Sequence, residues 1–227
     1  MIRHVEPRGR WTVAVLLALS LAGPAAAAQS ASAGSRIADT LSLGSGPYSR
    51  MHTKLEKTIF RVDVLMLDIW LGPDDAAQLE ELANGRRYSR ELAESIAAVA
   101  INSQDAFVRV EFLRDVSFEQ FLDGVDENLR LVPEAGIITK SDYEMISAGL
   151  PRWFGFLEER GVQKGDQMLY RIRGDTLRTQ FRASGGEILL EQTDVGPERR
   201  RAVLGSYLVR GSELHKGLIE SLFATGG

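Results

Sequence analysis

The chain has 227 residues, of which 44% are hydrophobic and 26% charged, with a formal net charge of −4 and no cysteine. This composition is typical of a globular protein and excludes collagen-like, disordered and disulfide-stapled chains. The absence of cysteine excludes thiolate nucleophiles, zinc knuckles and iron–sulfur ligation, and the acidic balance argues against a nucleic-acid partner.

The N-terminal region has the pattern of a secretory signal. Arginines precede an apolar run over residues 11–23, and the small residues Ala26 and Ala28 fit a signal-peptidase site. The apolar run is shorter than the roughly 20 residues that a membrane span needs. We therefore predict a signal peptide over residues 1–28 and a flexible linker over residues 29–46, with an uncleaved anchor as the alternative. An exported chain of this size without cysteine is typical of the bacterial periplasm, so we expect a periplasmic or secreted protein with no membrane span after cleavage.

Residues 47–225 are predicted to form one α+β domain. The strongest strand signal is the run TIFRVDVLMLDIWL, which is rich in β-branched and large apolar residues and is stopped by Gly72 and Pro73. Both faces of this strand are apolar, so we expect cover on both sides for part of its length. The strands expected from alternation and turn signals are 58–71, 107–116, 167–173, 176–183 and 187–192.

Helical spacing and capping residues predict helices between and after these strands. Ser117 and Gln120 resemble a capping box at the start of one helix, and Pro151 is expected to kink or split another. The helices expected are 76–83, 89–100, 118–131, 139–160, 197–208 and 214–223. Strands placed early and in a late meander, with helices between and after them, favour an antiparallel sheet with helices packed on it.

The sequence lacks the usual catalytic motifs, since no dinucleotide-binding, P-loop or nucleophile-elbow pattern follows the signal. His52 and His215 are not spaced as metal ligands, so neither a metal nor a cofactor is expected. The basic run Arg199, Arg200 and Arg201 lies at a predicted helix start, and we expect it to face solvent rather than to bind phosphate.

Arg61 and Asp63 are charged residues on one face of the strongest predicted strand. A buried charge must be paired or must meet a ligand, because an isolated ion in an apolar environment costs several kcal/mol. One interpretation is an internal ion pair between the two residues. The other is a guanidinium directed at an anion in an apolar cleft.

Four segments resemble the chalcone isomerase-like family, and together they span roughly residues 46–224: KTIFRVDVLMLDIWLG, RDVSFEQFLDGV, GDQMLYRIRGDTLRTQF and AVLGSYLVRGSELHKGLIESLF. The resemblance lies in their order and spacing rather than in one motif. It implies a chalcone isomerase-like open-faced β-sandwich, in which a helical layer covers a large antiparallel sheet and leaves a cleft for a planar or elongated apolar ligand. Bacterial members of the family often follow a signal peptide.

The resemblance also implies site residues. Enzymes of the family use an Arg near the first hairpin, a Thr on the next strand, a Tyr-Lys-Asn set on a helix and a Thr on a late helix, whereas related members bind fatty acids through an Arg and a hydroxyl partner. In this chain the first-hairpin Arg falls at Arg50, Arg61 replaces the strand Thr, and Ser206 falls at the late-helix Thr. Tyr143 begins a helix without the rest of the Tyr-Lys-Asn set. These departures argue against isomerase activity, and no catalytic residue is assigned.

We therefore expect an exported, non-catalytic chalcone isomerase-like protein that binds a small apolar anion such as a fatty acid, with Arg50, Arg61 and Ser206 as ligand-binding residues. Two alternatives stay open. One is an intramolecular lyase or isomerase acting on a chalcone-like enone, for which Tyr143 or another phenol must meet Arg50 in the cleft. The other is a structural or partner-binding periplasmic protein with a filled cleft. The sequence makes no prediction of the oligomeric state.

Overall fold

The structure is a computed structural model that describes residues 48–57 and 62–223, so the predicted signal peptide and linker lie outside the described residues. Its elements, in chain order, are β1 (Ser49–Lys57), β2 (Val62–Leu71), α1 (Pro73–Ala83), α2 (Arg90–Asn102), β3 (Asp105–Phe112), α3 (Phe118–Glu134), α4 (Lys140–Trp153), η1 (Gly155–Leu157), β4 (Gln167–Arg173), β5 (Thr176–Arg182), β6 (Ile188–Val195), α5 (Pro197–Leu208) and α6 (His215–Glu220).

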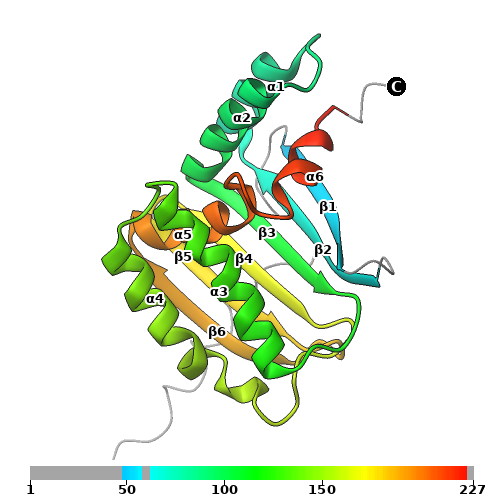
Figure 1. The fold of residues 1–227 in the computed structure, drawn as a ribbon, viewed down its shortest axis with the longest axis vertical. Helices are drawn as coiled ribbons and strands as arrows, with labels where there is room; N and C mark the ends of the chain where they lie inside the picture. Colours follow the sequence, from blue (N-terminus) through cyan, green and yellow to red (C-terminus); the bar gives the residue numbers. More distant parts are fainter. Residues whose placement is uncertain (1–47, 58–61, 224–227) are drawn as a thin grey trace, which may run out of the picture. The chain divides into compact units, whose positions relative to one another are not determined.

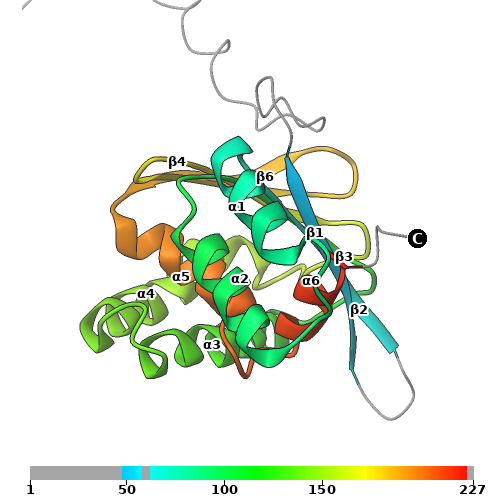
Figure 2. The same cartoon turned by 90° about the horizontal axis from the view of Figure 1, so that it is seen from above.

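The described strands form one six-stranded antiparallel sheet in the order β1-β2-β3-β4-β5-β6 (Figure 1). The larger helices pack on one face of this sheet (Figure 2). The predicted α+β fold, an antiparallel sheet covered by a helical layer, is confirmed. Helical cover on both faces, which the apolar run of β2 led us to expect, is not observed in the part of the chain that the structure describes.

The first hairpin differs from its prediction in two ways. Strand β1 was not predicted, because its few apolar positions alternate with charged ones, and residues 58–61 of the predicted strand lie outside the described residues. The pairing of β1 with β2 also shifts register, since Leu55 pairs with Leu65 whereas Glu56 pairs with Asp63. Val64 is therefore an extra residue in β2, as in a β-bulge, and it faces the same side as Leu65 instead of the opposite side.

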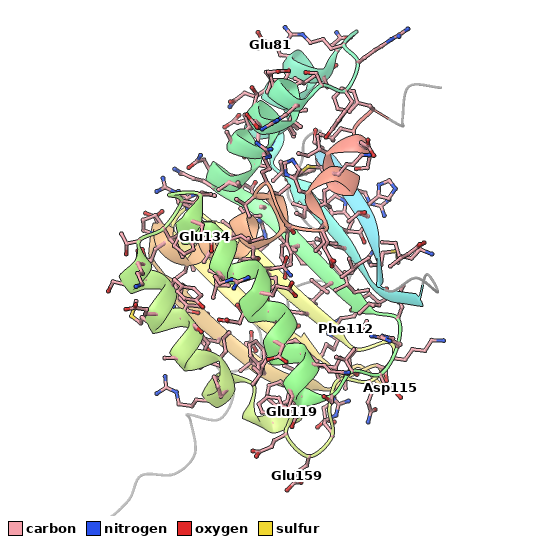
Figure 3. All side chains as sticks on the ribbon, viewed as in Figure 1. Glu81, Phe112, Asp115, Glu119, Glu134 and Glu159 are labelled. Atoms are coloured by element: carbon pink, nitrogen blue, oxygen red, sulfur yellow. The ribbon has the colours of Figure 1, made fainter. Side chains whose placement is uncertain are left out.

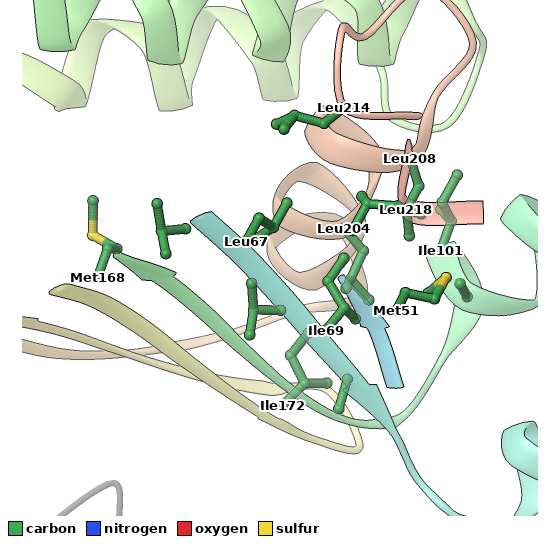
Figure 4. Close-up of a cluster of buried hydrophobic side chains, with 14 of the residues drawn as sticks. Met51, Leu67, Ile69, Ile101, Met168, Ile172, Leu204, Leu208, Leu214 and Leu218 are labelled. Carbon is green, nitrogen blue, oxygen red and sulfur yellow. The ribbon is translucent and has the colours of Figure 1, made fainter. Parts of the chain in front are cut away.

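The hydrophobic core lies between the sheet and the helices. Figure 4 shows Met51 and Ile69 of the sheet close to Leu204 of α5 and Leu218 of α6, and all four side chains are fully buried. Helix α5 approaches α3 closely, because a Cβ added at Gly205 would lie only 2.9 Å from Cγ1 of Val132. Because Gly205 has no side chain, α5 and α3 can pack at this short distance within the helical layer.

Local signals set several helix ends as predicted. The Oγ of Ser117 accepts a hydrogen bond from the backbone of Gln120, whose side chain accepts one from the backbone of Ser117, so the capping box is confirmed. Helix α4 ends at Trp153, two residues after Pro151, and the 3-10 turn η1 follows it. The expected split of the long helix near Pro151 is therefore confirmed.

Candidate functional site

An apolar cavity of about 400 Å³ lies between the sheet and helices α3, α4 and α5. Every strand contributes to its lining, from Leu55 of β1 to Leu190 of β6, and Phe121 of α3 and Leu150 of α4 contribute from the helical side. Pockets that bind small molecules typically have volumes of roughly 300–1,000 Å³ and mostly apolar linings. The cavity is therefore large enough for a small organic ligand.

The cavity wall draws on all six strands of the sheet. Neighbouring strands lie about 4.8 Å apart, so the five steps from β1 to β6 correspond to roughly 24 Å across the sheet. A lining that draws on all six strands accommodates a long, narrow apolar molecule better than a compact one.

Two phenols, Tyr170 of β4 and Tyr207 of α5, line the cavity. Burial raises the pKa of Tyr170 well above its usual value, and burial also raises the pKa of Tyr207 to about 12. Both phenols keep their protons at neutral pH, as ordinary phenols do, and burial extends this to alkaline pH. They offer hydrogen bonds to a ligand, but they do not supply a phenolate.

Ser206 lies in the cavity wall, as the prediction of a ligand-binding residue requires. It is 9% exposed, and its Oγ donates a hydrogen bond of 2.8 Å to the backbone carbonyl of Val203 in the preceding turn of α5. The hydroxyl proton is thus already used within the helix, so the oxygen is available to a ligand mainly as an acceptor. Its role as a ligand-binding residue stays a prediction.

Arg50 lies on the face of the sheet that points away from the helices, and it does not line the cavity. Its Nε and Nη2 donate hydrogen bonds of 3.0 and 2.6 Å to Oδ1 of Asp68. Arg109 donates from the same groups, at 3.2 and 2.7 Å, to Oδ2 of Asp68, and both guanidinium groups lie over the ring of Trp70. The structure therefore does not bring Arg50 and Ser206 together in one site.

Arg61, the third predicted ligand-binding residue, lies outside the described residues, and so does the side chain of Asp63. Neither the internal ion pair nor the anion-binding role is therefore described. Both stay predictions from the sequence.

The expectation that the basic run at the start of α5 faces solvent is wrong. Arg200 is only 3% exposed, and its Nη1 donates to the backbone carbonyls of Asn102 and Ser103 at 3.0 and 3.1 Å. Arg199 lies in the cavity wall, where its guanidinium is 5.8 Å from the ring centroid of Trp153. Successive residues of a helix point in different directions, so the three adjacent arginines of α5 have different surroundings. A run of like charges in the sequence does not show this difference.

Tyr143 does not belong to the cavity wall. Its hydroxyl donates to the carboxylate of Asp126 on α3, at 3.1 and 3.2 Å, and Ser147 donates to the same carboxylate at 2.6 Å. This cluster joins α3 to α4. The meeting of Tyr143 with Arg50, which the isomerase alternative needs, is thus absent from the described structure.

Sequence reasoning missed the cavity residues Arg114, Tyr170 and Tyr207. Tyr170 lies between the apolar neighbours of one strand face in the run MLYRIR, and Tyr207 lies four residues after Val203 on α5. The sequence signal that could have identified the two tyrosines was therefore a hydroxyl-bearing side chain at a position where the periodicity of the strand or helix predicts a buried apolar residue.

The described residues hold no group of three or more histidine or acidic side chains that could bind a metal ion. A search of the same residues for a helix with the length and hydropathy of a membrane span finds none.

No family model matches the chain, and no curated protein sequence matches it. Among solved structures, the crystal structure of a fatty-acid binding protein from Arabidopsis thaliana is similar, with 12% sequence identity and a TM-score of 0.48. The match covers 77% of this chain and 85% of that chain. A likeness at this level assigns neither a family nor a function, so membership of the chalcone isomerase-like family stays a prediction from the sequence resemblance.

Proposed function

We propose that this protein is a non-catalytic binding protein whose cavity takes an elongated apolar anion such as a fatty acid. The observation that carries this proposal is the apolar cavity of about 400 Å³ between the sheet and the helical layer. Burying an alkyl chain there contributes about 0.8 kcal/mol for each CH₂ group that leaves water. The length of the cavity across the six strands favours a chain over a compact ring system.

The absence of catalysis is supported by the positions of the polar groups. The phenols that face the cavity, Tyr170 and Tyr207, carry their protons at neutral pH as ordinary phenols do, and burial raises their pKa values further. The predicted first-hairpin arginine, Arg50, is on the other face of the sheet and is held by Asp68. The cavity wall contains cations and phenols, namely Arg114 and Arg199 with Tyr170 and Tyr207, but neither Arg50 nor a Tyr-Lys-Asn set like that of the family's enzymes is part of it.

The proposal includes export, which rests on the sequence pattern of residues 1–28. Protein isolated from its host would then begin at or near Gln29. Intact mass spectrometry measures this directly, and a species that retains Met1 in a membrane fraction would contradict both the signal and the periplasmic location.

Gly124 of α3 provides a direct test of the cavity, because it lines the cavity and a Cβ added there meets no atom within 4 Å. Gly124→Leu should fill part of the cavity without a clash, and it replaces a residue of low helix propensity by one of high propensity. We expect the variant to melt at or above the wild-type temperature and to lose at least tenfold in affinity for dodecanoate. Isothermal titration of delipidated protein measures the affinity.

The matched control is Gly155→Leu, since Gly155 also has open space around its Cβ position but does not line the cavity. This variant should bind dodecanoate as the wild type does. Wild-type protein that binds no fatty acid of any chain length, or a Gly124→Leu variant that binds as well as wild type, would refute the proposed site.

A further inference from the structure

Arg114 is a charged residue in the wall of the apolar cavity. It follows the end of β3, four residues before α3 begins. Figure 3 labels Phe112 and Asp115, which lie on either side of it in the sequence. Its Nε atom is buried and has no hydrogen-bond partner. The described residues also provide no carboxylate within ion-pair distance of its guanidinium.

A buried guanidinium donor without a partner is unusual, because native proteins satisfy nearly all such groups and an unsatisfied one is costly. Arg201 has the same feature, a buried Nε without a partner, but it does not line the cavity. What distinguishes Arg114 is therefore its position: the unused donor belongs to a side chain at the surface of a space that a ligand can occupy.

The geometry of a guanidinium suits one kind of ligand group. Its planar fork of N–H donors matches the two oxygens of a carboxylate, or of a similar oxyanion, and the resulting hydrogen bonds are charge-assisted. In a partly desolvated cavity such a pair is stronger than in water, since the local dielectric constant is low.

Other charges in the wall make Arg114 the better anion site of its two arginines. Arg199 stacks over Trp153, and it shares the β6 side of the cavity with the carboxylate of Asp194. The acidic residues that α3 contributes to the wall, Asp123 and Glu127, are exposed. The buried donor without a partner favours Arg114 over Arg199 as the anion site.

We propose that Arg114 binds the anionic head group of an elongated amphiphile, whose apolar tail extends across the strands towards β6. This inference rests on the proposed function, and it adds the position of the head group and the requirement for one anionic end. The ligand class is thus a long-chain monoanion with oxygen acceptors, rather than any apolar molecule of the right size.

The test compares dodecanoate with 1-dodecanol, which has the same chain but no charge. Wild-type protein should bind dodecanoate at least about 30-fold more tightly, because a charged hydrogen-bond partner is lost with the alcohol. Arg114→Met should bind the two ligands with similar affinity. Without ligand this variant should melt at or above the wild-type temperature, since the unsatisfied donor is gone.

Arg201→Met is the matched control, because it also removes a buried Nε that has no hydrogen-bond partner but leaves the cavity wall intact. It should keep the full preference for dodecanoate. A wild-type protein that binds both ligands equally, or an Arg114→Met variant that keeps the preference, would overturn the assignment of Arg114 and leave the binding function standing. Binding of neither ligand to wild type would overturn both.

Discussion

The two faces of the sheet are built from alternate residues of the same strands, yet they differ in chemistry. On the helix-covered face, Leu67 and Ile69 of β2 are fully buried in the hydrophobic core beside the cavity. On the opposite face, the intervening Asp68 and Trp70 form a charged and aromatic cluster with arginines from the flanking strands. One strand thus supplies apolar residues to the cavity side of the sheet and a charged cluster to the other side.

The polar clamp, formed by Arg50, Asp68, Trp70 and Arg109, lies on the sheet face opposite the cavity. Asp68 is 1% exposed and joins Arg50 of β1 to Arg109 of β3, so its carboxylate ties three strands together. The side chains that line the cavity on the other face make fewer packing contacts, because the empty space offers them no partner atoms. We infer that the clamp stabilises the sheet from the face that a ligand does not occupy.

Replacing Asp68 tests this comparison with the largest expected effect. Asp68→Asn removes the charge that four guanidinium hydrogen bonds share, and it should lower the free energy of unfolding by about 2–4 kcal/mol. Urea denaturation measures the loss. Affinity for dodecanoate, measured under conditions where the variant is folded, should stay within about twofold of wild type.

The control for this variant is Arg173→Met, which changes an exposed arginine of β4 and should shift stability by no more than about 0.5 kcal/mol. A large loss of ligand affinity in Asp68→Asn would show that the two faces are coupled. That result would contradict the separation of binding from stability.

A smaller effect is expected at alkaline pH, from the phenols of the covered face. In the unfolded chain Tyr207 releases its proton near pH 10, whereas in the folded protein it does so near 12. Between these values the unfolded state binds fewer protons than the folded state, so the free energy of unfolding falls as pH rises from about 10 to about 12.

Tyr207→Phe should reduce the alkaline loss of stability, because phenylalanine has no proton to release. Urea denaturation at several pH values between about 9 and 12 measures the slope. Ser206→Ala changes a neighbouring hydroxyl that does not titrate in this range, so it should leave the slope unchanged. An identical slope in Tyr207→Phe and wild type would show that this phenol is not shielded in the folded protein.

The smallest expected effect is on catalysis. Arg50 lies on the other face of the sheet from the cavity, and Tyr143 is held by Asp126 outside the cavity wall. Because the residue set of the family's enzymes is not assembled, purified protein should not accelerate cyclisation of 2′-hydroxychalcone above the spontaneous rate. Positioned acid and electrostatic groups usually contribute factors of about 100 or more each, so real catalysis would be easy to detect by absorbance. A saturable rate would restore the isomerase alternative, with the cations and phenols of the cavity wall as its candidate residues.

Signals that depend on a few neighbouring residues predicted much of the fold. The capping box of Ser117 and Gln120 and the helix end near Pro151 were both found as expected, as was the turn at Gly174 between β4 and β5, where a positive φ of 56° suits glycine. These features need only local sequence, because a cap or a turn satisfies backbone groups within a few residues.

The family resemblance implied a cleft and named Ser206 in it, but most of the cavity wall and the polar clamp depend on pairing between distant strands, so the sequence did not identify their residues. The bulge at Val64 turns one residue of β2 to the cavity side and breaks the simple alternation. The partners of Asp68 become visible only when β1 and β3 flank β2, although a lone acid in the apolar run LMLDIWL indicated a need for cations. Arg50 was predicted to bind the ligand, but the strand register places it on the far face of the sheet, where Asp68 holds it.

Under the proposed function, the cavity would link the lifetime of the protein to its ligand. A molecule that binds only the folded state stabilises it by about 2.7 kcal/mol when its free concentration is 100 times Kd. Proteases degrade the transiently unfolded fraction, which shrinks in proportion. Turnover of the chain would therefore slow when ligand is plentiful and quicken when it is scarce, so the amount of intact protein would follow the supply of ligand without any dedicated sensor.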